Sequence, residues 1–279
     1  MAKISYGCQT YPWKMNMEKF AGDVPHMAQV AAEAGFAGLE AEICMLGEYF
    51  DRPEEVREIL DKNGLELAAV VLHQKWEQEK ETDEEEALTK KTIEFVRHFP
   101  WAKIMVSHHA GAQPRGEGEA LKKRRENLLS CMDSVAVRAA EAGIVTCYHP
   151  NSAKNSLFRT AEDYQVLFDM LEKTSVGYAP DIGHIVNGGM DPLAILKAAR
   201  RLIRHVHFKD RAADGIWAVM GEGTIDYPGI VNYLRETEYA GWIMVEDESP
   251  RAEKDSDGVV KEDGNYMAQF WDESAKGGV

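Results

Sequence analysis

The sequence predicts an α/β protein folded as a single (β/α)8 TIM barrel, and three observations lead to this fold class. Short β-prone runs alternate eight times with longer amphipathic segments, which is typical of a parallel sheet covered by helices. The chain has 279 residues, somewhat more than the ~250 that are usual for this barrel. It contains no Gly/Ser/Pro-rich linker, so we expect one domain over residues 1–279.

Eight segments have the length and the residue types of buried strands. Eight repeats of strand and helix favour a closed barrel over an open, doubly wound sheet. The predicted strands are Ile4–Thr10, Gly38–Ile43, Leu65–Leu72, Ala102–His108, Ile144–His149, Ser175–Asp181, Ile203–Phe208 and Trp242–Glu246.

Several of the segments between the strands carry helix start and stop signals. Glycine directly follows three of them, as expected for a C-cap residue that adopts positive φ without steric cost. Another begins with an acidic N-cap residue followed by proline. The predicted helices are Asp23–Ala34, Arg52–Asn63, Leu121–Ala142, Thr160–Lys173 and Asp191–Arg201.

Two polar segments remain outside these strands and helices. We interpret the acidic run Glu77–Glu86 as a solvated loop that leads into a helix. Residues 250–279 are predicted to be a polar, irregular C-terminal extension. This extension is either a tail over the barrel mouth or an arm toward another subunit.

Composition and charge narrow the function classes. The formal net charge of -15 repels phosphate backbones, so we expect no nucleic-acid partner. No uncharged apolar run reaches the ~18 residues of a membrane span, and the N-terminus lacks an apolar signal core. The four cysteines form no C-x-x-C pair, which fits reduced thiols in a cytoplasmic protein.

Polar side chains stand at the end of nearly every predicted strand. In this fold the reacting groups lie at the C-terminal ends of the strands, so eight such positions converge on one mouth. We expect Glu40 and Glu42 to face alternate sides of their strand, and we take Glu42 as the inward one. The strand-end residues are Gln9, Glu40, Glu42, His73, His108, His109, His149, Asp181, His207 and Glu246.

We predict that His149, Asp181, His207 and Glu246 bind one divalent metal ion, because they end four consecutive strands. A single strand-end histidine is more often a structural residue, but the set of four favours a metal site. Imidazole and carboxylate ligands without thiolate suit Mn²⁺, Mg²⁺, Co²⁺ or Zn²⁺, and Mn²⁺ is the ion we expect.

Three tryptophans follow predicted strands and are candidates for the wall of a substrate pocket. Trp13, Trp76 and Trp217 present flat rings that stack on sugars. Packing within the loops explains these residues equally well, and the sequence leaves both alternatives open.

The motifs of the last four predicted strands resemble those of the xylose-isomerase-like barrel family, which includes sugar epimerases and isomerases, inosose dehydratase and endonuclease IV. The resemblance covers nearly the whole chain and is most specific from Gly143 to Glu246. Its motifs are VGYAPDIGH at 176–184, RHVHFKD at 204–210, GEGTID at 221–226 and GWIMVE at 241–246.

The resemblance implies Asp181, His207 and Glu246 as metal ligands. It also implies a substrate-contacting role for His184. Further polar residues around the mouth are implied at Lys209, Asp210 and Glu222.

One departure from the family pattern bears on the reaction. Many epimerases of the family end the fifth strand with a glutamate that binds metal and moves a proton. Here the run Tyr148-His149-Pro150-Asn151 takes its place and resembles the inosose-dehydratase branch, as does the opening 7–13. A histidine suits a two-carboxylate epimerisation poorly, so the sequence favours a dehydratase or other lyase over an isomerase or epimerase.

A metal ion that chelates a ketone oxygen and the adjacent hydroxyl acidifies the neighbouring C–H and gives an enediolate. Isomerisation, epimerisation and dehydration of a keto-sugar or keto-cyclitol share this first half. We take Glu246 as ligand and base, and His184, His73 and His108 as candidates for the second proton transfer. Predicted substrate-binding residues are Gln9, Glu42, Trp13, Lys209, Asp210 and Glu222.

Three alternatives stay open. The first is a sugar isomerase or epimerase at the same site. The second is a non-catalytic sugar-binding or subunit protein, which the histidine at position 149 would suit. The third, a nuclease for damaged DNA, is disfavoured by the negative charge. The sequence shows no Gly-rich phosphate loop, so we expect an unphosphorylated substrate, and a homo-oligomer is possible.

Overall fold

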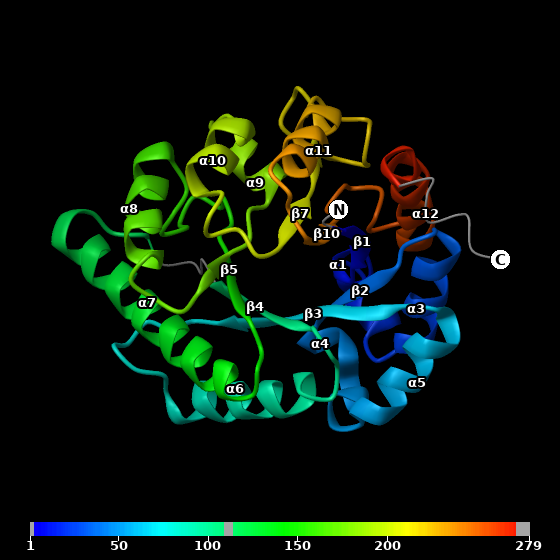
Figure 1. The fold of residues 1–279 in the computed structure, drawn as a ribbon, viewed down its shortest axis with the longest axis horizontal. Helices are drawn as coiled ribbons and strands as arrows, with labels where there is room; N and C mark the ends of the chain where they lie inside the picture. The colour runs from blue at the N-terminus through cyan, green and yellow to red at the C-terminus, as the bar shows by residue number, and fades with distance from the viewer. Residues whose placement is uncertain (1–2, 109–113, 272–279) are drawn as a thin grey trace. The chain divides into compact units, whose positions relative to one another are not determined.

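A computed structural model describes residues 3–108 and 114–271 of the chain. Hydrogen bonds join eight strands in the order β6-β5-β4-β3-β2-β1-β10-β7 (Figure 1). The strands are β1 (Ile4–Gln9), β2 (Gly38–Glu42), β3 (Glu66–Gln74), β4 (Lys103–His108), β5 (Thr146–His149), β6 (Gly177–Tyr178), β7 (Val206–Phe208) and β10 (Gly241–Val245).

The two ends of this strand order meet. Tyr178 of β6 forms a parallel bridge with Ile203, a few residues before β7. A closed set of eight parallel strands is the arrangement of a (β/α)8 barrel, and the predicted fold class is confirmed.

The sixth and seventh strands are shorter than predicted. β6 is limited to Gly177–Tyr178, because Pro180 follows closely and proline has no N–H to donate to a neighbouring strand. The chain then enters a short helix, α9 (Ile182–Asn187), whose N-cap is Asp181. A predicted strand end is therefore a helix start, which gives Asp181 a fixed side-chain orientation.

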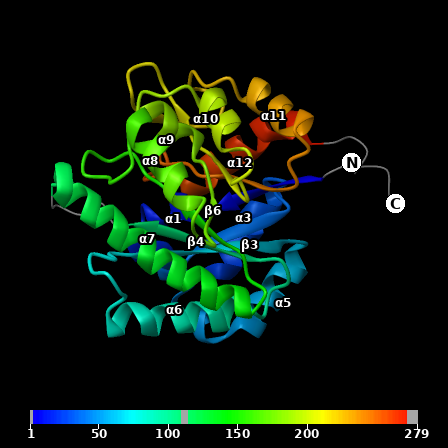
Figure 2. The ribbon, with the colours of Figure 1, turned by 60° about the vertical axis from the view of Figure 1, so that its left-hand side comes forward.

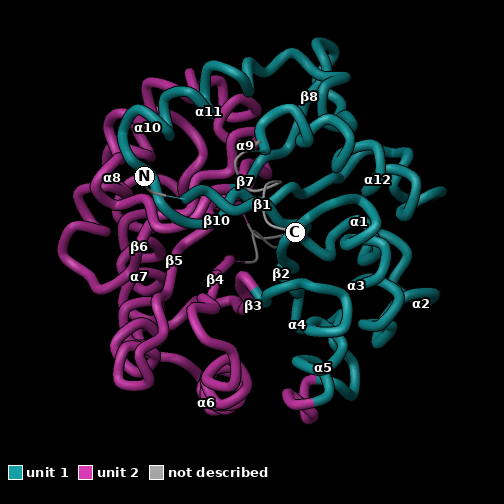
Figure 3. Tube along the Cα trace, turned by 45° about the vertical axis from the view of Figure 1, so that its right-hand side comes forward, with its two compact units in different colours: residues 1–49, 55–67, 207–279 teal, residues 50–54, 68–206 magenta. Residues whose placement is uncertain are grey.

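The chain divides into two compact units, formed by residues 1–49, 55–67 and 207–279 and by residues 50–54 and 68–206. They are drawn in teal and magenta in Figure 3. In the first unit β1 pairs in parallel with both β10 and β2. Further elements lying in it wholly or in large part are α1 (Tyr11–Lys14), α2 (Met17–Phe20), α3 (Val24–Glu33), α4 (Ile43–Leu46), η1 (Gly47–Asp51), α5 (Pro53–Asn63), β8 (Asp210–Arg211), β9 (Trp217–Ala218), α11 (Tyr227–Glu236), α12 (Ser256–Met267) and η2 (Ala268–Phe270).

In the second unit β3, β4, β5 and β6 pair in parallel in that order. Its core includes Ala69, Val71, Met105, Cys147 and Ala179, which are buried together. Helices α6 and α7 lie against β4 and β5 (Figure 2). The helices of this unit are α6 (Asp83–Val96), α7 (Gly118–Glu141), α8 (Ala161–Leu171), α9 (Ile182–Asn187) and α10 (Pro192–Ala199).

Three of the five predicted helix starts are confirmed by their caps. The Asp23 side chain accepts a hydrogen bond from the His26 N–H at the start of α3, and Asp191 caps α10. Thr160 forms a capping box with Asp163 at the start of α8. Each cap satisfies backbone N–H groups that have no partner within the helix.

Residues 250–271 are more regular than the irregular extension that the sequence led us to expect, and the rest of that predicted extension lies outside the described residues. Residues Ser256–Met267 form α12, which begins at the N-cap Asp255. Its buried positions Val259, Asp263 and Met267 recur every four residues and form one helix face. Polar and small residues between them conceal this periodicity. Within residues 3–108 and 114–271, no helix has the length and apolarity needed to cross a membrane.

Candidate metal centre and active site

The pairing register of β2, β1 and β10 in the first unit places three polar side chains side by side, at the same height along their strands. Gln9 at the end of β1 is paired with Glu40 on β2. On the other side of β1, Cys8 is paired with Val245, so that Glu246 follows at the level of Gln9. All three side chains are buried.

The His207 imidazole lies between two carboxylates of the same unit. Its Nδ1 is 2.9 Å from Glu246 Oε2, and its Nε2 is 3.0 Å from Glu40 Oε1. Burial disfavours protonation, but the two carboxylates outweigh it and raise the pKa of His207 to about 10. The surroundings of His207 therefore favour a positive charge at this position.

Glu246 also receives a charged hydrogen bond from Lys209. The Lys209 Nζ lies 2.8 Å from Glu246 Oε1 and 2.6 Å from Glu248 Oε1, and the lysine side chain is fully buried. A buried ammonium is stable only when it is paired with opposite charge, which the two glutamates supply. Glu246 is thus held by Lys209 at one oxygen and by His207 at the other.

In the second unit Asp181 is fixed by its helix cap. Its Oδ1 accepts a hydrogen bond of 2.7 Å from the backbone N–H of His184. Its Oδ2 lies 3.4 Å from Nε2 of His149, at the end of β5. Since the Asp181 side chain is fully buried, the cap leaves it little freedom, and Oδ2 stays directed at His149.

A chain of hydrogen bonds orients the His184 ring. The Asn187 amide donates to Ser152 Oγ at 2.8 Å, and Ser152 Oγ lies 2.8 Å from His184 Nδ1. Because Ser152 accepts from Asn187, its single hydroxyl proton is available for Nδ1. Ser152 Oγ also has a second lone pair that can accept from a protonated Nδ1, so the contact orients the ring in either form. The edge of the ring faces His149, with 5.6 Å between centroids.

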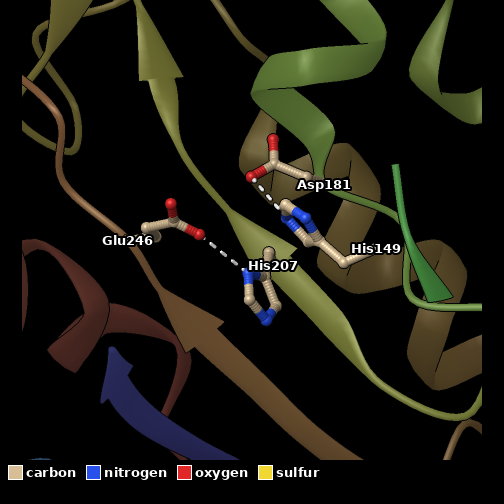
Figure 4. Close-up of side chains that lie close together, drawn as sticks. All are labelled: His149, Asp181, His207 and Glu246. Carbon is tan, nitrogen blue, oxygen red and sulfur yellow. Dashed lines mark hydrogen bonds and ion pairs between the residues drawn. The ribbon is translucent and has the colours of Figure 1, made fainter. Parts of the chain in front are cut away.

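Figure 4 shows the four predicted metal ligands as the pairs His149–Asp181 and His207–Glu246. One ligand-type atom of each residue lies within 4.8 Å of the others, and all four residues are buried. Nitrogen and carboxylate-oxygen donors without sulfur suit divalent ions such as Mn²⁺ and Zn²⁺. The donor set therefore fits the kind of ion that the sequence predicts.

The expectation that only one of Glu40 and Glu42 points inward is wrong, because residues two apart on a strand share a face. Glu40 contacts His207, while Glu42 Oε1 lies 3.0 Å from Lys14 Nζ and 3.5 Å from Gln9 Nε2. The sequence reasoning therefore missed Glu40 as a partner of a metal-ligand candidate. The two-residue spacing from Glu42 was the signal that would have found it.

The three tryptophans differ in burial. Trp13 lies in α1, is fully buried and donates its indole N–H to Asp257 at 2.8 Å, which favours packing over a pocket wall. Trp76 is buried as well. Trp217 on β9 is half-buried, and its ring centroid lies 5.4 Å from Lys209 Nζ. For Trp217 a place in the wall of the substrate pocket therefore stays a prediction.

Two residues predicted to contact substrate, Asp210 and Glu222, also have contacts within the protein. Asp210 accepts hydrogen bonds from the backbone N–H groups of Arg211, Gly221 and Gly223, which shapes the loop before α11. Glu222 is exposed and pairs with Arg251 at 3.1 Å. Their proximity in sequence to Lys209 is thus explained by the shape of this loop.

The remaining strand-end histidines lie in different surroundings. His73 is exposed at the end of β3 and lines a pocket of about 470 Å³ with Gln74 and Thr82, and none of its described lining residues is a predicted metal ligand. His108 is buried at the end of β4, and its carbonyl oxygen accepts from the Asn151 amide. His109 falls outside the described residues.

The family model described as xylose isomerase-like TIM barrel matches residues 28–270. The rhizopine catabolism protein MocC of Rhizobium meliloti is 29% identical over 264 residues, which cover 84% of this chain and 78% of that protein. An inosose dehydratase of Lacticaseibacillus casei is 27% identical over 246 residues, 78% of this chain and 80% of that protein.

A solved structure of IolI protein with a binding zinc atom has a TM-score of 0.76 to this chain. The sequences are 14% identical, and the match covers 95% of this chain and 97% of that one. At 14% sequence identity, this similarity shows a shared fold only.

Proposed function

This chain belongs to the xylose isomerase-like TIM barrel family, and from that premise we propose that it dehydrates an uncharged keto-cyclitol with the help of one divalent metal ion. The observation that carries the proposal is the buried set His149, Asp181, His207 and Glu246. The relatives named inosose dehydratase support the reaction type and the substrate class.

His149, Asp181, His207 and Glu246 would hold the ion, with Mn²⁺ as the expected metal, and the zinc named for IolI supports a divalent ion. When bound, such an ion supplies Lewis acidity to a ketone oxygen, which makes the neighbouring C–H more acidic. Glu40 Oε2 lies 3.2 Å from His207 Nε2 and would accept its proton, so that Nδ1 would be the nitrogen that helps to hold the ion. A carboxylate behind a metal-binding histidine is a common device that fixes its ring orientation.

The charges around the strand ends of the first unit favour an uncharged substrate. Lys14 is paired with Glu42, and Lys209 with Glu246 and Glu248. Both ammonium groups already face carboxylates, so a substrate phosphate or carboxylate would lie among like charges. Hydroxyl groups suit these surroundings better, because they donate hydrogen bonds to carboxylates.

Dehydration removes a proton from the carbon beside the ketone and a hydroxyl from the next carbon, and together they leave as water. Glu246 is proposed to take the carbon-bound proton. Its Oε1 keeps a second lone pair beside the hydrogen bond from Lys209. Protonated His184 is proposed to give a proton to the departing hydroxyl, which leaves as water. The proton taken up by Glu246 is then lost to solvent, and His184 takes one back.

The second candidate is a sugar isomerase or epimerase at the same site, which would share the first proton removal. Histidine at position 149 disfavours it, since an epimerase needs an acid or base on each face of the substrate. A non-catalytic sugar-binding protein is the third candidate, and the buried donor set disfavours it.

The test is incubation of the purified, Mn²⁺-loaded protein with 2-keto-myo-inositol. We expect a new ultraviolet absorbance from the conjugated enone, dependence on metal, and loss of at least about 100-fold in rate for Asp181→Asn. The exposed Glu172→Gln, whose partner is Arg201, serves as a control that keeps its activity. A rearranged sugar without absorbance would replace the dehydratase by an isomerase, and failure to retain metal after dialysis would favour the binding protein.

A further inference from the structure

Helix α12 joins two loops that border the candidate active site. We propose that α12 holds both loops in place through Asp257 and Asp263, which act as positioning residues for substrate binding, an assignment that rests on the proposed function of the site. The helix lies within the stretch that the sequence predicts to be a tail or an arm, and it packs against α3 and α1 of the first unit. Figure 1 shows α12 beside α3.

Asp257 holds the loop that follows β1. Its Oδ1 accepts a hydrogen bond of 2.8 Å from the buried Trp13 indole, and both of its oxygens lie 3.0 Å from His26 Nε2 on α3. The neighbouring Ser256 hydroxyl donates to the carbonyl of Pro12 at 3.0 Å. Two side chains of α12 therefore form hydrogen bonds with α1, the short helix that follows the end of β1 in the sequence.

Asp263 holds the loop that lies between β9 and α11. Its carboxylate is buried and accepts a hydrogen bond of 2.9 Å from the Met220 N–H. At the next residue, Gly221, a Cβ would come within 2.4 Å of the Tyr266 ring on α12. Asp210 accepts from the Gly221 N–H on the side of β8. The loop is thus fixed between α12 and the chain segment that carries Lys209.

Aromatic rings in the first loop and directly before the second lie near the buried Lys209. Its Nζ lies 5.8 Å from the Tyr11 ring centroid in α1 and 5.4 Å from that of Trp217 on β9. Lys209 in turn donates to Glu246, the proposed ligand and base. A shift of either loop would therefore change the aromatic surface beside the reacting groups without removing a metal ligand.

The helix itself is anchored to the body of the unit. A Cβ at Gly264 would meet the Ala34 carbonyl oxygen at 2.2 Å, so α12 packs with its backbone close to the end of α3. Lys261 adds an exposed ion pair of 2.8 Å with Glu33. A rigid anchor on one side and two loop contacts on the other are what a positioning element requires.

The experiment compares Asp257→Ala and Asp263→Ala with the unchanged protein by hydrogen exchange, metal affinity and kinetics. We expect faster exchange in residues 10–16 for the first variant and in 217–224 for the second. The KM for 2-keto-myo-inositol should rise about tenfold in each, as expected for loss of one hydrogen bond to a charged group, with kcat within about twofold. Affinity for Zn²⁺ should stay unchanged.

Asp257→Asn is the conservative variant, since it keeps an acceptor for the Trp13 indole and should restore the KM. Lys261→Ala is the matched control on the same helix, because its partner Glu33 lies outside both loops, and it should leave both segments and the KM unchanged. Unaltered exchange in the two segments, or an equal increase throughout the chain, would overturn the proposal. If the unchanged protein turned over no keto-cyclitol, the proposed function would fail, while exchange would still decide the role of α12.

Discussion

Single carboxylates at the candidate site each serve two partners, one per oxygen. Asp181 caps α9 with Oδ1 and faces His149 with Oδ2. Glu246 accepts from Lys209 with Oε1 and contacts His207 with Oε2. This division fixes the rotamer of each acid before any ligand arrives, which lowers the ordering cost of binding. Substitution of a neighbouring residue therefore affects the site through orientation.

Ser152 provides a test of such orientation. Ser152→Ala removes the hydroxyl that faces His184 Nδ1, so the ring would lose the partner that orients it. We expect kcat to fall about tenfold, a fraction of what a general acid contributes, with unchanged affinity for Zn²⁺. Steady-state kinetics on the enone-forming reaction measure the effect.

The control for this change is Ser156→Ala, which deletes a buried hydroxyl of the same loop that donates to Asn151. Ser152→Thr keeps the hydroxyl and should recover most of the activity. A Ser152→Ala protein with full kcat would show that His184 is not the proton donor.

Glu40 provides the second test at this scale. Glu40→Gln removes a buried negative charge 3.0 Å from His207 Nε2. The charge stabilises a divalent ion more than a single proton on His207, so we expect metal affinity to fall about tenfold or more. Competition against a fluorescent zinc chelator gives the dissociation constant.

Glu42→Gln is the matched comparison, because it lies on the same strand and contacts Lys14 and Gln9 in place of His207. It should keep the affinity within about twofold. If both variants lost the same metal affinity, Glu40 would act through the net negative charge of the site and its contact with His207 would not matter.

The types of the metal-ligand candidates could be read from the sequence, but their partners could not. Strand ends mark where polar side chains converge, and motif resemblance singles out Asp181, His207 and Glu246. The contact between His207 and Glu40 joins residues 167 positions apart, and no local pattern encodes it. For the same reason the sequence could not show that Asp210 accepts hydrogen bonds from backbone N–H groups of a nearby loop.

At the scale of elements, regular segments were predictable and short or polar ones were not. Helices with an apolar face and a distinct cap, such as α3 and α10, match their predicted ranges within two residues at either end. The hairpin of β8 and β9 has two residues in each strand, too few to show an alternating pattern. Helix α12 buries polar residues such as Asp263, which conceals its amphipathic character.

The close packing of α12 on α3 predicts the effect of one added methyl group. Alanine in a helix interior is normally favoured over glycine by about 1 kcal/mol. At Gly264, however, a Cβ would lie 2.2 Å from the Ala34 carbonyl oxygen. We expect Gly264→Ala to lower the free energy of unfolding by about 2 kcal/mol, in the range typical of overpacking. Urea denaturation followed by circular dichroism measures the change.

Asn265→Ala is the control for helix propensity, since this side chain is exposed one position further along α12. It should stabilise the protein slightly or leave it unchanged. A Gly264→Ala protein as stable as this control would contradict the close contact between α12 and α3.

At the scale of the whole molecule, stability should depend on pH through His207 and on whether metal is bound. In the metal-free protein the pKa of His207 is raised from 6.5 to about 10. A raised pKa in the folded state gives stability that is complete below pH 6.5 and is lost as pH rises toward 10. The metal-free protein should therefore lose stability over this interval.

Metal binding should remove this dependence, because an ion at Nδ1 takes the place of the proton that faces Glu246. The metal-loaded protein should keep its stability between pH 6.5 and 10, and binding should release a proton, so that affinity rises by up to about tenfold per pH unit in this window. Urea midpoints of both forms at several pH values provide the measurement. His207→Gln should flatten the metal-free profile as well. If stability fell equally with pH in the metal-free and the metal-loaded protein, the ion would not bind at His207. The metal centre on which the proposed dehydration depends would then be wrong.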